Sequence, residues 1–97
     1  MAVLNELIHQ PARLRIMAVL AAISPERQAT FGFLKATCEL TDGNLGAHLR
    51  RLEEAGYVTI VKTFVRQKPQ TYVAITDAGR AAFEEHRVAL QAILDSA

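Results

Sequence analysis

The chain has 97 residues and a formal net charge of +1, and 51% of its residues are hydrophobic, which suits one domain with one modest core. A single cysteine excludes an internal disulfide framework, and no apolar run approaches the ~20 residues that span a bilayer. The opening segment carries Glu6 and lacks the basic start of a signal peptide, so we expect one domain over residues 1–97, cytoplasmic and not bound to a membrane.

The first quarter of the sequence predicts two helices. Leu4, Leu7 and Ile8 have helical spacing. Pro11 fits the first turn of a second helix, where its missing N–H does no harm. That helix stays apolar up to Ser24-Pro25-Glu26, where the proline predicts a break.

The middle of the sequence predicts two more helices joined by a tight turn. Thr30 is a suitable N-cap for a short helix that ends near residue 38 or 39. A turn through Leu40 then leads to a helix from about Asp42 to Ala55. We expect Cys38 to be a small buried core residue, with a redox switch as the less favoured interpretation.

The helix from about Asp42 to Ala55 has boundary signals at both ends. The Thr41 hydroxyl can cap its start, and Gly56 suits the left-handed position just after its end. Tyr57 then falls where a Schellman motif places an apolar contact to the helix. The buried stripe of this helix is formed by Leu45, Leu49 and Leu52.

Two segments rich in β-formers, residues 57–61 and 71–75, flank a polar stretch from Arg66 to Gln70. This pattern predicts a two-stranded hairpin with an exposed basic tip. Between Ala55 and Thr76 there are no acidic residues and three basic ones: Lys62, Arg66 and Lys68. Thr76-Asp77 then caps a final helix to about Asp95.

The predicted order is therefore four helices, a hairpin and a fifth helix. Two short helices joined by a tight turn and followed by a basic hairpin form a winged helix-turn-helix. We expect a fold that is mainly α with a small β-hairpin, classed as α+β.

Residues 40–45, 47–49 and 52–58 resemble the recognition-helix signature of MarR/ArsR-like winged-helix transcriptional regulators. A compact single-domain subgroup also shows the pattern formed here by Lys62, Phe64, Arg66, Pro69, Thr71, Thr76, Gly79 and Arg80. The resemblance spans residues 31–83. It implies a homodimer on a near-palindromic DNA operator, with the first and last helices at the dimer interface.

The recognition helix offers few groups that can read bases. At about 100° per residue, its outer face carries Gly43, Ala47 and Arg50, with Asn44 and His48 nearer the core. Asn44 can pair with adenine, and Arg50 with guanine or a phosphate. We expect the DNA-binding residues to be Thr41, Gly43, Asn44, Ala47, His48, Arg50 and Arg51, with Lys62, Arg66 and Lys68 on the wing.

Some of these residues have a structural alternative. His48 can close the motif's own hydrogen bonds, Arg51 can be a solvated side chain, and the wing can be a hairpin kept soluble by charge. Gly43 and Gly46 each cost about 0.5–1 kcal/mol relative to alanine inside a helix. We expect Gly43 to serve either close approach to DNA or the geometry of the helix N-terminus, and Gly46 to serve packing against the preceding helix.

Apolar residues at the two ends of the chain predict a dimer interface. They are Leu4, Leu7, Ile8, Phe83, Leu90, Ile93 and Leu94. Packing of Phe83 and Leu90 within the chain is the alternative for part of this stripe. A two-fold axis there would place two recognition helices one DNA turn apart.

The sequence predicts no metal and no cofactor. Cys38 is alone, and His9, His48 and His86 lack ligand spacing, although His9 and His86 can meet near the dimer interface. A small-molecule effector between the helices of a dimer is compatible with the fold, but no residue points to one.

The sequence also predicts that the protein is not an enzyme, because its serines and glycines match no nucleophile or phosphate-loop motif. The main rival to a DNA-binding regulator is a winged helix that binds other proteins, since fold alone does not fix function. The small number of base-reading side chains on the outer face of the recognition helix favours that rival. The basic wing and the Asn44, His48 and Arg50 side chains favour double-stranded DNA.

Overall fold

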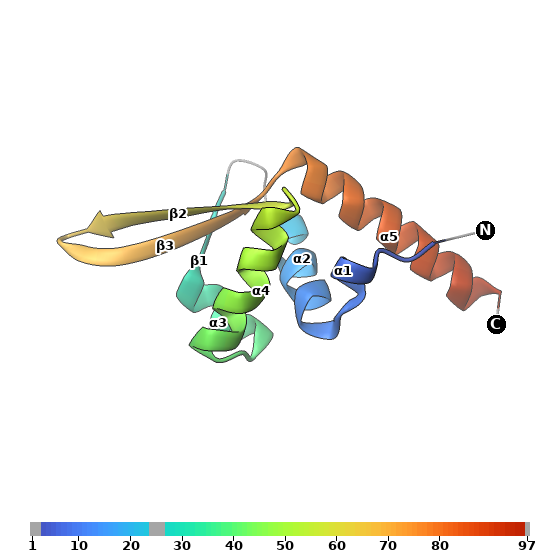
Figure 1. The fold of residues 1–97 in the computed structure, drawn as a ribbon, viewed down its shortest axis with the longest axis horizontal. Helices are drawn as coiled ribbons and strands as arrows, with labels where there is room; N and C mark the ends of the chain where they lie inside the picture. Colours follow the sequence, from blue (N-terminus) through green and yellow to red (C-terminus); the bar gives the residue numbers. More distant parts are fainter. Residues whose placement is uncertain (1–2, 24–26, 97) are drawn as a thin grey trace.

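The computed structural model describes residues 3–23 and 27–96, and the break predicted at Ser24-Pro25-Glu26 lies outside them. The described elements, in chain order, are α1 (Glu6–His9), α2 (Pro11–Ala22), β1 (Ala29–Thr30), α3 (Phe31–Cys38), α4 (Asp42–Glu54), β2 (Val58–Val65), β3 (Lys68–Ile75) and α5 (Asp77–Asp95). Helices α2, α3 and α4 form the centre of the molecule (Figure 1). The β2–β3 hairpin projects from one side and α5 from the other, which confirms the winged helix-turn-helix and its α+β class.

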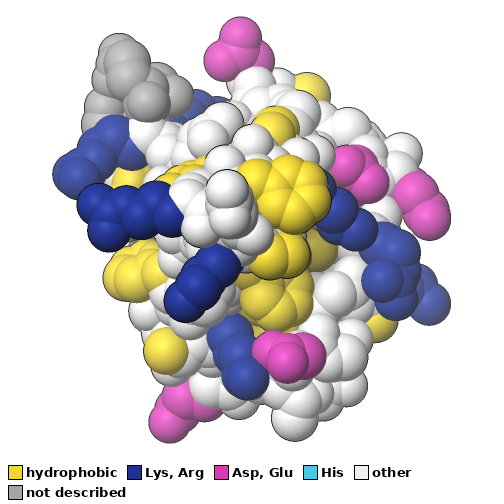
Figure 2. Space-filling model, turned by 90° about the vertical axis from the view of Figure 1, so that its left-hand side faces the viewer, with side chains coloured by type: hydrophobic (Ala, Val, Ile, Leu, Met, Phe, Trp, Pro, Cys, Tyr) yellow, Lys and Arg dark blue, Asp and Glu magenta, His cyan; other side chains and the backbone are white. Residues whose placement is uncertain are grey.

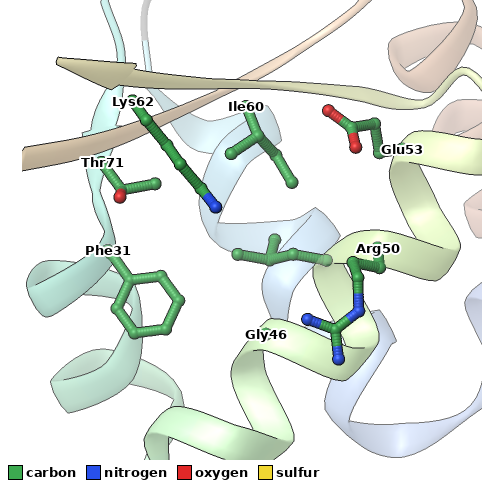
Figure 3. A pocket seen from close by; sticks show the side chains of 8 residues that line it. Phe31, Gly46, Arg50, Glu53, Ile60, Lys62 and Thr71 are labelled. Atoms are coloured by element: carbon green, nitrogen blue, oxygen red, sulfur yellow. The ribbon is translucent and has the colours of Figure 1, made fainter.

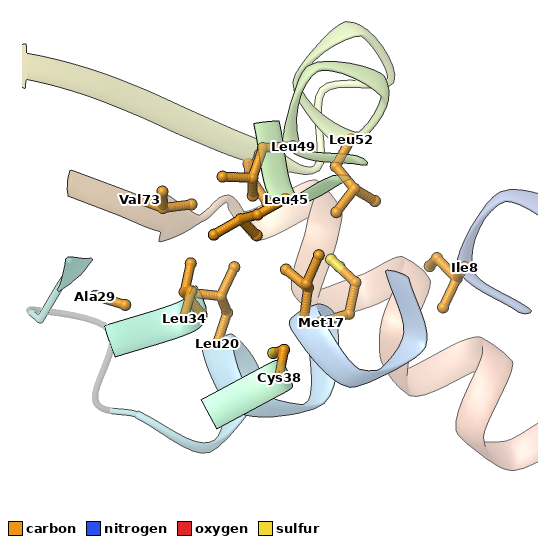
Figure 4. Packing of buried hydrophobic residues seen from close by; sticks show 12 residues of the cluster. Ile8, Met17, Leu20, Ala29, Leu34, Cys38, Leu45, Leu49, Leu52 and Val73 are labelled. Atoms are coloured by element: carbon orange, nitrogen blue, oxygen red, sulfur yellow. The ribbon is translucent and has the colours of Figure 1, made fainter. Parts of the chain in front are cut away.

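The core lies where α2, α3 and α4 meet the base of the sheet (Figure 4). The predicted leucine stripe of α4 is buried there, because its spacing of four and then three residues keeps it on one face of the helix. Cys38 is also buried in this cluster, and burial raises the pKa of its thiol. This confirms Cys38 as a core residue.

Side-chain caps define the helix starts as predicted. The hydroxyls of Thr30, Thr41 and Thr76 accept hydrogen bonds from the backbone N–H groups three residues further on. At the end of α4, Gly56 has a φ of 81° and its N–H donates to the Glu53 carbonyl. The N–H of Tyr57 donates to the Leu52 carbonyl, which completes the Schellman motif.

The wing is longer and its turn shorter than predicted. The two strands pair in antiparallel register out to Val65 opposite Lys68, so only Arg66 and Gln67 form the turn. Pro69 therefore lies inside β3, not in a loop. It is tolerated because it faces Phe64, one pair beyond the closing pair of the turn, where an antiparallel ladder makes no N–H···O bonds.

A third strand, β1, was not predicted. Ala29 and Thr30 pair with Val73 and Tyr72, which gives the strand order β1-β3-β2. Two residues are too few to show the alternation that marks a strand. The short strand fixes the start of α3 against the base of the wing.

Candidate nucleic-acid interface

The outer face of α4 is open to solvent. Thr41, Gly43, Asn44, Ala47, Arg50 and Arg51 are all exposed, while His48 is half-buried. The predicted contact residues on this helix, apart from His48, are thus free of cover within the described chain. The face is long enough to lie along a DNA groove, because 13 helical residues span about 20 Å.

The two glycines of α4 are not explained by packing within the chain. A Cβ built on Gly43 would meet no atom within 4 Å. One built on Gly46 would meet only the flexible Arg50 guanidinium, at 3.5 Å. The prediction that Gly46 packs against the preceding helix was therefore wrong. Neither glycine relieves a clash within the chain, and both leave the helix backbone uncovered by a side chain at their positions.

Asp42 at the start of α4 has a basic partner. Its carboxylate lies 3.0 Å from the ammonium of Lys35 on α3, and both side chains are largely exposed. The anion is favourable at a helix N-terminus, and Lys35 offsets its repulsion of a phosphate. Beside it, the Thr41 hydroxyl accepts from the Asn44 N–H, so its own O–H remains available as a donor.

His48 is held by an arginine of α2. The Arg13 Nη1 lies 3.1 Å from His48 Nδ1. Burial first, and then the nearby Arg13 and Arg51, lower the pKa of His48 below its usual 6.5. The alternative role for His48, closing a hydrogen bond within the motif, is thus present in the structure, and one nitrogen of its ring is left over.

A groove of about 650 Å³ separates α4 from the wing. Arg50 enters it from α4 and Lys62 from β2, so two cations converge from opposite walls (Figure 3). Phe31, Leu49 and Ile60 contribute its apolar floor and sides. Glu53 lies at the same groove, and no ion pair joins it to either cation among the described residues.

The wing carries basic residues from the groove, at Lys62, out to its turn, at Arg66 and Lys68. Lys62, Arg66 and Lys68 are all exposed, and Lys and Arg side chains surround hydrophobic ones on this end of the molecule (Figure 2). Arg66 and Gln67 have φ values of 51° and 66°. Such a two-residue turn matches the twist of the strands but is usually built from Asn and Gly. The strained turn therefore has Arg66 where asparagine is usual and Gln67 where glycine is usual.

Two residues absent from the predicted contacts stand out. Phe64 is 72% exposed and lies on the same face of the hairpin as Lys62. The alternation of β2 marked that face, but the strand was expected to end at residue 61. No sequence pattern pointed to Arg13, because Arg13 and His48 are 35 residues apart in the chain and meet only in the folded protein.

The predicted dimer residues differ in how much surface they leave for a partner. Ile8 is fully buried in the chain's own core, so it has no surface left for a partner, and Leu7 and Phe83 also pack against that core. Leu4 and Leu90 are half-buried. Ile93 and Leu94, near the end of α5, are 43% and 60% exposed. Helix α5 extends past the rest of the chain at this end, beside the N-terminal segment (Figure 1).

His9 and His86 meet, as the sequence suggested. His86 is 1% exposed, its Nδ1 accepts from the Asn5 N–H at 3.0 Å, and its Nε2 lies 3.4 Å from His9 Nδ1. Because Nδ1 accepts, the neutral ring carries its proton on Nε2 and donates it to His9. Within the described part of the chain, no three His, Cys, Asp or Glu side chains cluster as metal ligands.

Acid is expected to destabilise the fold through His86. Burial, and then His9, lower its pKa in the folded chain, so the unfolded chain binds the extra proton first. The free energy of unfolding should fall as the pH drops below about 6.5, and level off below the folded-state pKa. Urea unfolding at fixed protein concentration between pH 5 and pH 8 measures how steeply the free energy of unfolding depends on pH.

The matched variant is His86→Asn, whose amide oxygen can replace Nδ1 as acceptor for the Asn5 N–H. The free energy of unfolding of this variant should depend less steeply on pH. The dependence that remains comes from groups common to both proteins, His48 among them. Equal slopes in the two proteins would contradict this role of His86.

No helix in residues 3–23 or 27–96 combines the length and the apolar character needed to cross a membrane.

Comparison with known proteins agrees with this architecture. A family profile described as a winged helix DNA-binding domain matches residues 12–94. An uncharacterized protein of Methanocaldococcus jannaschii is 35% identical over 81 residues, which cover 84% of this chain and 85% of that protein. The chain is thus related to a protein of nearly its own length.

Solved structures show the same relation. The transcriptional regulator homologue protein from Pyrococcus horikoshii superimposes with a TM-score of 0.84 and 35% identity, over 95% of this chain and 88% of that one. A MarR-family transcriptional regulator from Silicibacter pomeroyi gives a TM-score of 0.69 at 24% identity, over 93% of this chain and 57% of that one, and shares the fold. These matches point to a regulator and not to an enzyme. The chain belongs to the winged helix DNA-binding domain family, and together these matches support a DNA-binding transcriptional regulator.

Proposed function

We propose that the protein is a sequence-specific regulator that places α4, about residues 42–55, in the major groove of double-stranded DNA. The wing, about residues 62–70, then lies on the backbone or in the minor groove. The observation that carries the proposal is the groove between α4 and the wing, where Arg50 and Lys62 converge from opposite walls. A sugar–phosphate strand held there would meet both cations at once.

Base reading in this proposal depends on few side chains. Asn44 and Arg50 are exposed on α4 and supply hydrogen-bonding groups for base edges, with His48 at the margin. The glycines and Ala47 keep the rest of the face bare, which lets the helix backbone approach the groove. Arg51 stays a proposed phosphate contact, because its side chain is exposed and it takes part in no ion pair among the described residues.

Arg66→Ala is expected to weaken binding to all DNA sequences. Each lost phosphate contact should reduce the slope of log affinity against log salt by about 0.9. Titrations at several salt concentrations, with a specific and a random duplex, measure both effects. The matched control is Gln67→Ala, which alters the same strained turn without removing charge and should leave the slope unchanged. An unchanged slope for Arg66→Ala would remove Arg66 from the interface.

The regulator is proposed to act as a homodimer through the exposed end of α5 and the N-terminal segment beside it. Leu90 and Ile93 extend the stripe by which α5 packs on the chain, but Ile93 is 43% exposed beyond the other helices. Leu94 and the half-buried Leu4 add to this apolar end. A two-fold axis there would present two copies of α4 to successive major grooves, about 34 Å apart.

Ile93→Glu is expected to convert the dimer to a monomer, because it places a charge in an apolar interface. Val88→Glu is the control, since Val88 is 53% exposed on a different side of α5 and should leave the dimer intact. Sedimentation at micromolar concentration reports both. A monomeric wild-type protein under these conditions would contradict the dimer.

A further inference from the structure

Arg13 links three parts of the chain at the edge of the recognition helix. It lies in the first turn of α2, and its Nε donates to the Leu7 carbonyl of α1, at 2.6 Å. Its Nη1 lies 3.1 Å from His48 Nδ1 on α4. The guanidinium is therefore held at both ends, and its position relative to α4 is set by the helices behind it.

The contact with Arg13 fixes which nitrogen of His48 carries the proton. A guanidinium has only donors, so His48 Nδ1 must be the acceptor and carries no hydrogen. The ring is then neutral, and its single proton is on Nε2. The charged groups that face the ring are Arg13 from α2 and Arg51 from α4 itself, and both oppose a second proton.

The other nitrogen of His48 is open. Among the described residues no partner is found for Nε2, and no buried side-chain nitrogen or oxygen lacks one. Nε2 must therefore reach solvent at the edge of α4. Its N–H is a donor of fixed identity, whereas a free histidine would present either a donor or an acceptor there.

We propose that Arg13 is a positioning residue that holds His48 as the neutral Nε2–H tautomer, so that α4 offers one N–H donor to an acceptor on a base edge in the major groove. The acceptors available there are guanine N7 and O6, adenine N7 and thymine O4. This inference rests on the proposed function, because it needs α4 to lie in the groove. It adds a residue that touches no DNA but decides what His48 can read.

The tautomer can be measured on the free protein by the ¹⁵N shifts of the His48 ring. The wild type should show Nε2–H alone. Arg13→Met keeps most of the side chain's length but removes the donors, and should give a mixture of tautomers and a higher His48 pKa. Arg51→Ala removes the same charge without the hydrogen bond, so it should raise the pKa but keep the single tautomer. An unchanged tautomer in Arg13→Met would overturn the proposal.

The consequence for DNA is measured by selecting bound sites from random duplexes. Arg13→Met and His48→Ala should lose preference, by about tenfold, at the same base pair of each half-site. The double variant should lose no more than His48→Ala, since both act through one contact. Arg87→Ala, a charge change at an exposed site of α5, should leave the preference intact.

This selection tests the role of Arg13 and the proposed function separately. Loss at different base pairs, or additive losses, would show that Arg13 does not act through His48 and would overturn the inference alone. A wild-type protein without any sequence preference would contradict the proposed function, and the ring shifts would then still decide whether Arg13 fixes the tautomer.

Discussion

Replacing Gly79 with alanine is expected to destabilise the fold by about 3 kcal/mol, enough to lower the melting temperature by about 12 °C or more. A Cβ at this position would lie far inside contact distance of the Tyr57 carbonyl and 2.9 Å from Cγ1 of Ile75. The Tyr57 carbonyl cannot move away easily, because it accepts the Thr76 N–H at 3.0 Å. One methyl group would therefore have to separate α5 from the base of the wing.

The Gly79 contact lies at a junction of four elements. The Thr76 hydroxyl accepts from the Gly79 N–H and donates to the Gly56 carbonyl at 2.6 Å, so it joins the start of α5 to the end of α4. Displacing this junction would tilt the wing and α4 relative to each other. We expect the loss of stability to be accompanied by loss of DNA binding.

Gly32→Ala is the matched control for Gly79→Ala. Gly32 is in α3, and a Cβ there would meet no atom within 4 Å. The substitution should stabilise the protein by about 0.5–1 kcal/mol, because alanine loses less backbone entropy than glycine on entering a helix. Thermal and urea unfolding of the two variants should give shifts of opposite sign. Equal shifts in the two variants would show that the close contacts around Gly79 do not exclude a side chain at this position.

Gly43→Ala is expected to make the protein more stable and a weaker DNA binder. The position is exposed and has free space around it, so the fold should gain about 0.5–1 kcal/mol. On DNA the new methyl group would stand between the helix backbone and the groove. A misfit of this size costs about 1–3 kcal/mol, which corresponds to a loss of about fivefold to about 150-fold in affinity.

Gly32→Ala again supplies the comparison, because it should give the same gain in stability with no loss of affinity. Melting temperature and affinity for one duplex, measured on both variants, separate the two effects. Unchanged affinity in Gly43→Ala would show that the α4 backbone does not approach DNA at this point. The bare face would then be better explained by a protein partner.

What the sequence predicted well is what depends on neighbours along the chain. Helix starts at Thr30, Thr41 and Thr76 and the end of α4 at Gly56 follow from capping, which acts over three or four residues. The leucine stripe of α4 follows from helical periodicity. These local signals were sufficient to predict the winged-helix order.

What the sequence could not predict depends on contacts between distant segments. The two residues of β1 form a strand only because β3 lies beside them. Arg13 reaches His48 only because the fold brings α2 against α4. The space around Gly46 could not be inferred from its helix, and the packing role expected for it was wrong. The burial of Ile8 also depends on tertiary packing, which helical spacing alone does not reveal.

The central claim is that α4 and the wing together read a DNA sequence. The most direct measurement is selection of bound sites from random duplex DNA at two salt concentrations, followed by sequencing. We predict an enriched near-palindrome whose half-sites are one helical turn apart, with affinity that falls steeply with salt. Recovery of no enriched sequence at either salt concentration would contradict the account and favour a winged helix that binds proteins.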